Sequence, residues 1–364
     1  MTKTDVTAGQ YFSVCFLSLT VGTFLYVSSS GVKAGSPLSP LLPVLLCAVN
    51  LLLSLPLLKL INRCRDDGVL VFCERRSPAF SRTVAALYAL IFTYALIRTA
   101  ARFDLFASAE MFAQSSTAFF TVLLLAICTA LSFKGLAALC RAGVIFTVIV
   151  LAGTATVLLL SYFQDFDILN FAVIDKLKGD ELIVSSLDYA FFPVETGALT
   201  LFCGRIKGNI KKSYRVFLVL SSIFLLLTAA AVTGSLGAFA DTQLFPVYAL
   251  STVRGIGLAE RLDAVQTAVW LFCIICKMTF FILIIKECLN HLCKDSARLP
   301  FSLAIITAAV FSVAVSRNII NFKTVSSFGG TAAAYLLSVL IIPAFALFIC
   351  RLKTEKPKGG CIPE

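Results

Sequence analysis

The sequence predicts an all-α integral membrane protein with ten transmembrane helices, and its composition is the first observation that does so. Hydrophobic residues form 59% of the 364 residues, charged residues form 14%, and the mean hydropathy is +0.93. Soluble domains carry about 25% charged residues. A chain this poor in charge cannot cover itself with a hydrated surface, so lipid must cover it instead.

The second observation is the number of apolar stretches. A helix that crosses the hydrocarbon core needs about 20 mainly apolar residues. Ten stretches qualify: 10–30, 38–61, 83–106, 117–133, 141–163, 187–204, 215–239, 261–288, 300–317 and 330–351. The longest connection, Gln164 to Ser186, is too short for a soluble domain. We therefore expect a single polytopic membrane domain over 1–364, ending in a cytoplasmic tail at 352–364.

The third observation is how basic residues alternate between loops. The connections after the second, fourth, sixth and eighth stretches, with the two tails, hold most of the 31 lysines and arginines. The connection between the fifth and sixth stretches is acidic by contrast. Short basic loops lie on the cytoplasmic side of a membrane. The pattern therefore predicts an even number of helices with both termini in the cytoplasm.

Two of the stretches contain residues that interrupt helices. Gly22 lies near the middle of the first, and the sixth reads Phe191-Phe192-Pro193-Val194-Glu195-Thr196-Gly197. These two stretches are the first helices of two five-helix halves, 10–163 and 187–351. The halves would insert with opposite topology because five is odd. Broken helices at matching positions of inverted repeats indicate a binding site near the membrane midplane. The alternative is a packing glycine and an ordinary proline kink.

Four ionisable residues lie at membrane depth, where an ion usually faces a cavity or a partner. Glu195 lies in the sixth stretch and Lys277 deep in the eighth. Lys277 can snorkel, pair with Glu195, or take the place of a coupling cation. Arg98 and Arg102 are one turn apart in the third stretch and can line a pocket or snorkel to the outer headgroups. Trp270, two turns before Lys277, either walls a cavity or packs.

Several classes of function are disfavoured by what the sequence lacks. Most of the 13 cysteines lie in apolar runs, where a thiol behaves as a small hydrophobe. The one histidine, His291, cannot form a metal site alone, and Cys273-Ile-Ile-Cys276 has no second pair at zinc-ligand spacing. No hydrolase motif appears in the helices, and the scattered basic residues do not form a nucleic-acid surface. We expect no enzyme activity, no cofactor, no metal and no nucleic-acid partner.

Several segments resemble the B subunits of spore-germination nutrient receptors (GerAB-type endospore germination permeases), a family within the amino acid–polyamine–organocation superfamily. The similar segments are Glu260-Arg261-Leu262-Asp263 running to Trp270 and Lys277, Phe245-Pro246-Val247, Leu87-Tyr88-Ala89-Leu90, Lys134-Gly135-Leu136 with Arg141, and Phe191–Gly197 with the basic loop Arg205–Lys212. Each motif is short, but together they extend over nearly the whole chain in order.

This resemblance implies a LeuT-like fold that senses a nutrient in the inner membrane of the spore, together with A and C receptor subunits. It implies that an amino acid or similar small nutrient contacts the first and sixth helices. The residues carried over are Val21, Gly22, Thr23, Phe192, Val194, Glu195 and Thr196, with Trp270 as a further candidate. Where the family often places a proline one turn after the first break, this chain has Phe24 and then Leu25-Tyr26-Val27. A cation-coupled amino acid permease is the alternative function.

Overall fold

The computed structural model of the protein describes most of the 364 residues as helix. The described residues are 6–24, 35–64, 67–111, 118–164, 166–172, 193–252, 262–293, 298–316 and 328–352. Two predicted ligand contacts fall outside them: Phe192, and the side chain of Thr23.

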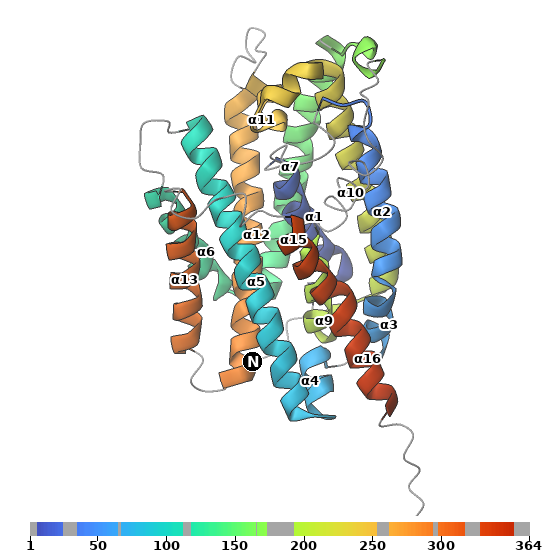
Figure 1. Ribbon diagram of the computed structural model, residues 1–364, viewed down its shortest axis with the longest axis vertical. Helices are drawn as coiled ribbons and strands as arrows, with labels where there is room; N and C mark the ends of the chain where they lie inside the picture. Colours follow the sequence, from blue (N-terminus) through green and yellow to red (C-terminus); the bar gives the residue numbers. More distant parts are fainter. Residues whose placement is uncertain are drawn as a thin grey trace, which may run out of the picture.

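The helices form one bundle whose members run along its long axis (Figure 1). The first half contains α1 (Ala8–Phe24), η1 (Ser39–Leu41), α2 (Leu42–Leu53), α3 (Leu55–Arg63), α4 (Val69–Glu74), α5 (Pro78–Phe106), the π-helical η2 (Ala107–Met111), α6 (Ala118–Ser132), α7 (Leu136–Gln164) and η3 (Ile168–Phe171). The second half contains η4 (Val194–Ala198), α9 (Leu199–Phe202), η5 (Cys203–Arg205), α10 (Ile210–Leu236), η6 (Gly237–Thr242), α11 (Pro246–Thr252), α12 (Leu262–Cys293), α13 (Arg298–Ser316), α15 (Phe328–Tyr335), the π-helical η9 (Leu336–Ile341) and α16 (Ile342–Leu352).

Five helices in the described part of the chain are long and apolar enough to cross a membrane. They are Pro78–Glu110, Leu136–Phe163, Ile210–Thr242, Asp263–Cys293 and Gly329–Ile349. A sixth span results if α2 and α3, bent by 45°, count as one, and Ala8–Gly22, Ala118–Ser132 and Phe301–Ala314 are shorter apolar helices. The protein is thus a multi-pass α-helical membrane protein. Every predicted stretch apart from 187–204 overlaps one of these helices, and the count of ten stays a prediction.

The two predicted interruptions differ in the structure. Helix α1 continues without a break through Gly22 to Phe24, where its described part ends. The sixth stretch does depart from α-helix, because Val194–Ala198 forms a 3₁₀ helix before the single α-turn of α9. The predicted interruption at Gly22 is therefore not found in the described part of α1.

Side chains on the outside of the bundle are apolar, as lipid contact requires. Leu90, Val148 and Phe163 are examples, with 63% to 84% of their surface exposed. Helix α12 is buried on most of its surface, and it packs against α1, α5, α6 and α7. Because α12 lies at the centre of the bundle, a charged residue on it meets protein rather than lipid.

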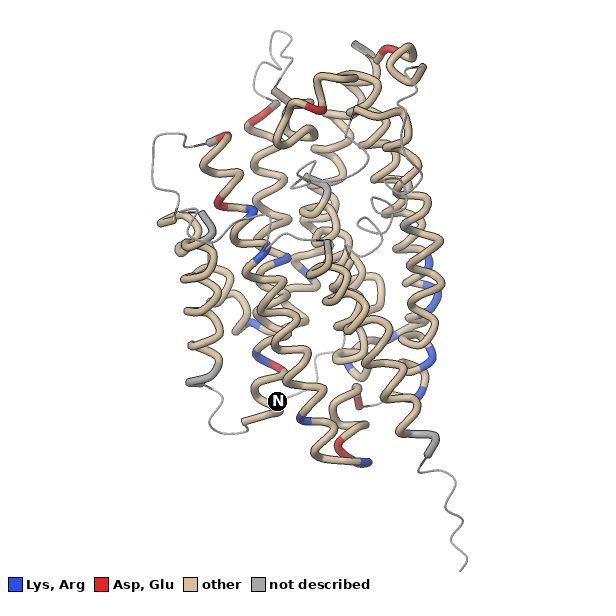
Figure 2. The backbone as a smooth tube through the Cα atoms, in the orientation of Figure 1, with Lys and Arg blue, Asp and Glu red and all other residues tan. Residues whose placement is uncertain are grey.

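The amino-terminal segment is tied to the middle of the chain by a short parallel sheet. Strand β1 (Val6–Thr7) pairs with β2 (Ile206–Lys207), which directly follows η5. Figure 2 shows acidic positions toward both ends of the bundle, and basic positions at mid-height and in the lower half.

Candidate functional site

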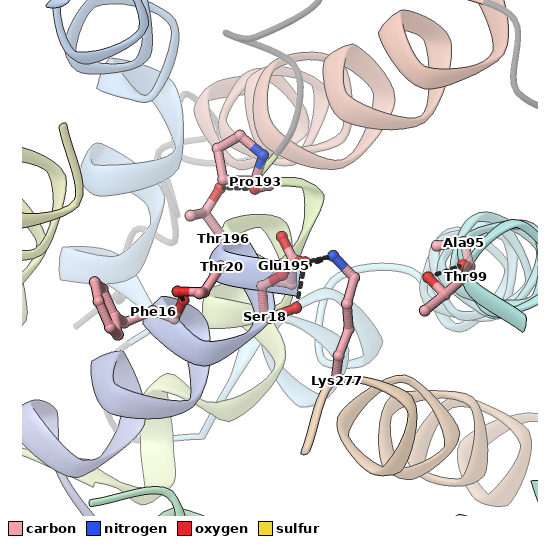
Figure 3. A network of polar contacts seen from close by, with 9 residues as sticks. All are labelled: Phe16, Ser18, Thr20, Ala95, Thr99, Pro193, Glu195, Thr196 and Lys277. Atoms are coloured by element: carbon pink, nitrogen blue, oxygen red, sulfur yellow. Dashed lines mark hydrogen bonds and ion pairs between the residues drawn. The ribbon is translucent and has the colours of Figure 1, made fainter. Parts of the chain in front are cut away.

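The site begins with the irregular backbone at the start of η4. Pro193 has no N–H, and its carbonyl accepts hydrogen bonds from the Thr196 amide at 3.0 Å and the Thr196 hydroxyl at 2.8 Å. These bonds tighten the turn to 3₁₀ geometry and direct Thr196 back onto its own backbone (Figure 3). The turn leaves Glu195 free to project toward α1 and α12.

Glu195 meets Lys277 in the interior. Lys277 Nζ lies 2.7 Å from Glu195 Oε1, and the same ammonium donates a hydrogen bond to the main-chain carbonyl of Ser18 at 2.9 Å. The Ser18 hydroxyl donates a short hydrogen bond to Glu195 Oε1. Figure 3 shows the three side chains converging from α1, η4 and α12. One polar cluster therefore connects the first, sixth and eighth predicted helices.

Both charges of this pair are almost fully removed from solvent. The side chains of Lys277 and Glu195 are 8% and 1% exposed. Burial of two ions is expensive, and their attraction offsets it only when the geometry is good and further hydrogen bonds are made. Ser18 supplies those bonds, and the ammonium lies 5.5 Å from the centre of the Phe281 ring. Glu195 Oε2 has no hydrogen-bond partner among the described residues.

A cavity opens beside the polar cluster; we refer to it as the central cavity. The space within it measures about 480 Å³, which includes open solvent at its mouth. Its lining residues are Val21 and Gly22 of α1, Tyr94, Ala95, Arg98, Thr99 and Arg102 of α5, Val194 of η4, Lys277 and Phe281 of α12, and Thr331 and Ala334 of α15. Elements from both halves of the chain thus form one chamber.

Six of the residues singled out from the sequence line the central cavity: Val21, Gly22, Val194, Lys277, Arg98 and Arg102. Arg102 is 9% exposed and Arg98 is half-buried. Both arginines line the cavity together with Lys277. Glu195 and Thr196 are not among the lining residues. Both are buried and form hydrogen bonds with neighbouring residues.

Trp270 packs away from the central cavity. Its ring lies 5.7 Å from that of Phe103 and 4.3 Å from that of Phe106, and it is not among the lining residues. The sequence left open whether Trp270 walls a cavity or packs against other side chains. The structure places it in an aromatic cluster, where it packs.

Several site residues were missed by the sequence analysis. Ser18, Thr99 and Thr331 are small hydroxyl residues, which are common in membrane helices and so do not stand out. Tyr94 and Phe281 are aromatic residues in apolar runs. Asp104, which lies outside the cavity lining, is a further buried charge that the sequence analysis did not single out. It is 1% exposed on α5, and Thr121 donates a 2.7 Å hydrogen bond to one of its oxygens.

The chemistry of the site suits reversible binding. In the described part of the chain, no group of three or more His, Cys, Asp or Glu residues could hold a metal ion. The polar groups of the site are an ion pair, guanidinium groups and hydroxyls around a chamber with apolar walls. Such a chamber binds a small molecule by burying its apolar part and fixing its polar group.

Comparison with known proteins identifies the family. The family model described as "Spore germination protein" matches residues 5–322. The chain belongs to the spore germination protein family. No curated protein matches this chain. The match begins before β1 and ends beyond α13, so the whole site of this spore germination protein lies within it apart from α15.

A solved transporter shares the fold of this spore germination protein. It is described as the "substrate-bound outward-open state of a Na+-coupled sialic acid symporter", with a TM-score of 0.60 and 12% sequence identity. The similarity covers 92% of this chain and 79% of the symporter. At this identity the comparison shows the fold alone, which is that of a LeuT-like transporter.

Proposed function

We propose that this protein is the nutrient-sensing membrane subunit of a spore germinant receptor. The observation that supports it best is the contact of α1, η4 and α12 through Ser18, Glu195 and Lys277 beside the central cavity. A small nutrient, such as an amino acid or a similar molecule, enters the cavity and contacts α1 at Val21 and Gly22. Binding changes the relative populations of two arrangements of these elements.

In this proposal the chain has ten transmembrane helices in two inverted five-helix repeats, 10–163 and 187–351. It lies in the inner membrane of the spore with both termini in the cytoplasm. The receptor A and C subunits respond to the arrangement that the ligand favours. The ordered arrangement of short motifs along the chain supports this assignment, together with the family to which the chain belongs.

A cation-coupled amino acid permease is the second candidate. The observation that favours it is the shared fold with a Na+-coupled symporter. In a permease the same chamber opens alternately to each side of the membrane, so the cavity residues alone do not separate the two functions.

The experiment that distinguishes a receptor subunit from a permease uses spores that lack this gene. Germination is scored against a panel of single nutrients, and uptake of labelled amino acids is followed in growing cells of the same strain. Loss of the response to one nutrient class with normal uptake is expected. Normal germination with lost uptake would instead identify a permease.

A further inference from the structure

The outer surface of the bundle carries exposed basic residues on two neighbouring helices. They are Lys59 and Arg63 of α3 and Lys212 and Arg215 of α10. None of these four side chains forms an ion pair with a residue that the structure describes. Neither α3 nor α10 contains an acidic residue. The two helices therefore present positive charge without supplying a counter-charge of their own.

The four basic residues lie at the same end of the bundle, because α2 and α10 are antiparallel. Helix α10 packs against α2 and against η1, which precedes α2. Thr233, near the end of α10, donates a 3.3 Å hydrogen bond to the main-chain carbonyl of Ser36, just before η1. Since α3 continues from α2 after Ser54, its end lies toward the start of α10. Figure 2 shows basic positions gathered in the lower half of the bundle on the side where Figure 1 labels α3.

Each basic pair continues a stripe of apolar residues on the outside of its helix. In α3, Leu55, Lys59 and Arg63 are four residues apart, so they share one side of the helix, and Leu55 is exposed. In α10, Lys212 lies on the same side as three exposed apolar residues of the following turns. These are Val216, Val219 and Ile223. A molecule with an apolar chain can thus follow either stripe and reach a basic group at its end.

The position of the basic residues along the membrane normal fits a charged headgroup. Ile210–Thr242 is long and apolar enough to cross the membrane, so its first turns lie at one boundary of the hydrocarbon core. Lysine and arginine side chains extend from such a position into the headgroup layer. Lys212 lies in the first turn of α10, where the positive pole of the helix favours an anion. Clusters of basic residues beside a spanning helix attract lipids of negative charge.

We infer that α3 and the start of α10 form a binding site for an anionic phospholipid. The four basic residues hold its phosphate, and its acyl chains follow the two apolar stripes. The inference goes beyond the proposed function and does not depend on it, because a receptor subunit and a permease would present the same surface. A lipid bound in this way would connect α3 to α10.

The test measures lipid binding to the purified full-length protein in detergent, by native mass spectrometry and thermal stabilisation. The probes are phosphatidylglycerol and phosphatidylcholine with the same acyl chains, which differ in net charge. We expect phosphatidylglycerol to bind at least about tenfold more tightly, because each basic residue near the headgroups favours an anionic lipid by about fivefold. Equal binding of the two lipids would overturn the inference.

Variants locate the site. Neutralising all four residues together, with glutamine at each position, should remove the preference for phosphatidylglycerol. Exchanging lysine and arginine at the same four positions keeps the charge and should keep the preference. Arg82→Gln is the matched control for a single substitution such as Arg63→Gln, because Arg82 is an exposed arginine on another helix. Wild-type affinity in the fourfold glutamine variant, or an equal loss in Arg82→Gln and Arg63→Gln, would contradict the site.

Two further probes separate a lipid from a free anion. Inorganic phosphate and glycerol phosphate carry the charge of the headgroup without acyl chains, so at equal concentration they should stabilise the protein much less than phosphatidylglycerol does. Equal stabilisation by either would assign the basic residues to a soluble anion and overturn the assignment to a lipid. Thermal unfolding of every variant in phosphatidylcholine alone shows that the fold is intact, since all four residues are exposed.

Discussion

Lys277 donates a hydrogen bond to the main-chain carbonyl of Ser18 at 2.9 Å while it pairs with Glu195 at 2.7 Å. The ammonium therefore holds α12 to α1 and to η4 at the same time. A backbone carbonyl in a helix has a second lone pair to offer, so this contact does not require α1 to unwind. Any movement of α1 relative to α12 must stretch or exchange this bond.

The first prediction concerns the buried ion pair. Glu195→Gln or Lys277→Met should each abolish the nutrient response and lower the midpoint of thermal unfolding, because each leaves one buried group without its partner, at a cost of about 3–5 kcal/mol. The double variant should be more stable than either single variant, since neither charge is then left alone. Thermal unfolding of the wild type, the two single variants and the double variant measures the coupling free energy between the two side chains.

Strictly additive losses in that cycle would mean that the two side chains act independently. A single variant that is inserted at normal level and has a normal dose response would exclude Glu195 or Lys277 from the sensing mechanism.

The second prediction concerns Gly197, which packs tightly against η9. A Cβ atom at this position would lie 2.6 Å from Ser338 Cβ and 3.1 Å from the Ser338 main-chain carbon. Gly197→Ala should therefore force η4 and η9 apart and lower thermal stability, although alanine is the better helix former. The matched control is Gly9→Ala in α1, where nothing lies within 4 Å and no loss is expected. Equal stability of the two variants would contradict the close packing.

The third prediction concerns the Tyr88 hydroxyl, which lies 3.0 Å from Thr200 Oγ1, 3.4 Å from the Gly197 carbonyl and 3.2 Å from the Ser338 carbonyl. This group joins α5 to the sixth and tenth predicted helices. Tyr88→Phe should destabilise the protein by about 1–3 kcal/mol, because it leaves buried polar groups without a partner. Chemical denaturation in mixed micelles measures the change. An unchanged free energy of unfolding would show that the hydroxyl is not a structural link.

The fourth prediction concerns Arg205 and Glu287, which form a bidentate pair with N–O distances of 2.6 and 3.1 Å. Their side chains are 41% and 33% exposed, so solvent screens the pair. Arg205→Gln should change the free energy of unfolding by no more than about 1 kcal/mol. The exchange Arg205→Glu with Glu287→Arg should recover that change at low salt. A much larger loss, independent of salt, would mean that the pair supports the fold directly.

The sequence predicted most of the helices and singled out the charged residues within them, Lys277 and Glu195 above all. Both successes have a physical reason. An apolar run long enough to span a bilayer has few alternatives to helix, so every predicted stretch but one overlaps an apolar helix. Lys277 and Glu195 stood out because charges are rare in such runs, and the structure brings them to 2.7 Å. Their role in sensing stays a prediction.

Other features depend on how the helices are rotated and packed. The direction of Arg98 and Arg102, inward or toward headgroups, is decided by the rotation of α5 against α12. Ser18 could not be chosen among many similar serines until α1 lay beside η4. Trp270 was ambiguous for the same reason, because its partners Phe103 and Phe106 belong to another helix.

The parallel pairing of β1 with β2 has a consequence for biosynthesis. Val6 pairs with Ile206, so the first described residues of the chain reach their partner only after more than half of the protein has been translated. Until then α1, with its buried Ser18 and Thr20, has no α10 or α12 to pack against. Domains otherwise tend to fold from the amino terminus as they emerge. The first helix therefore reaches its final packing only after α10 and α12 have been synthesised.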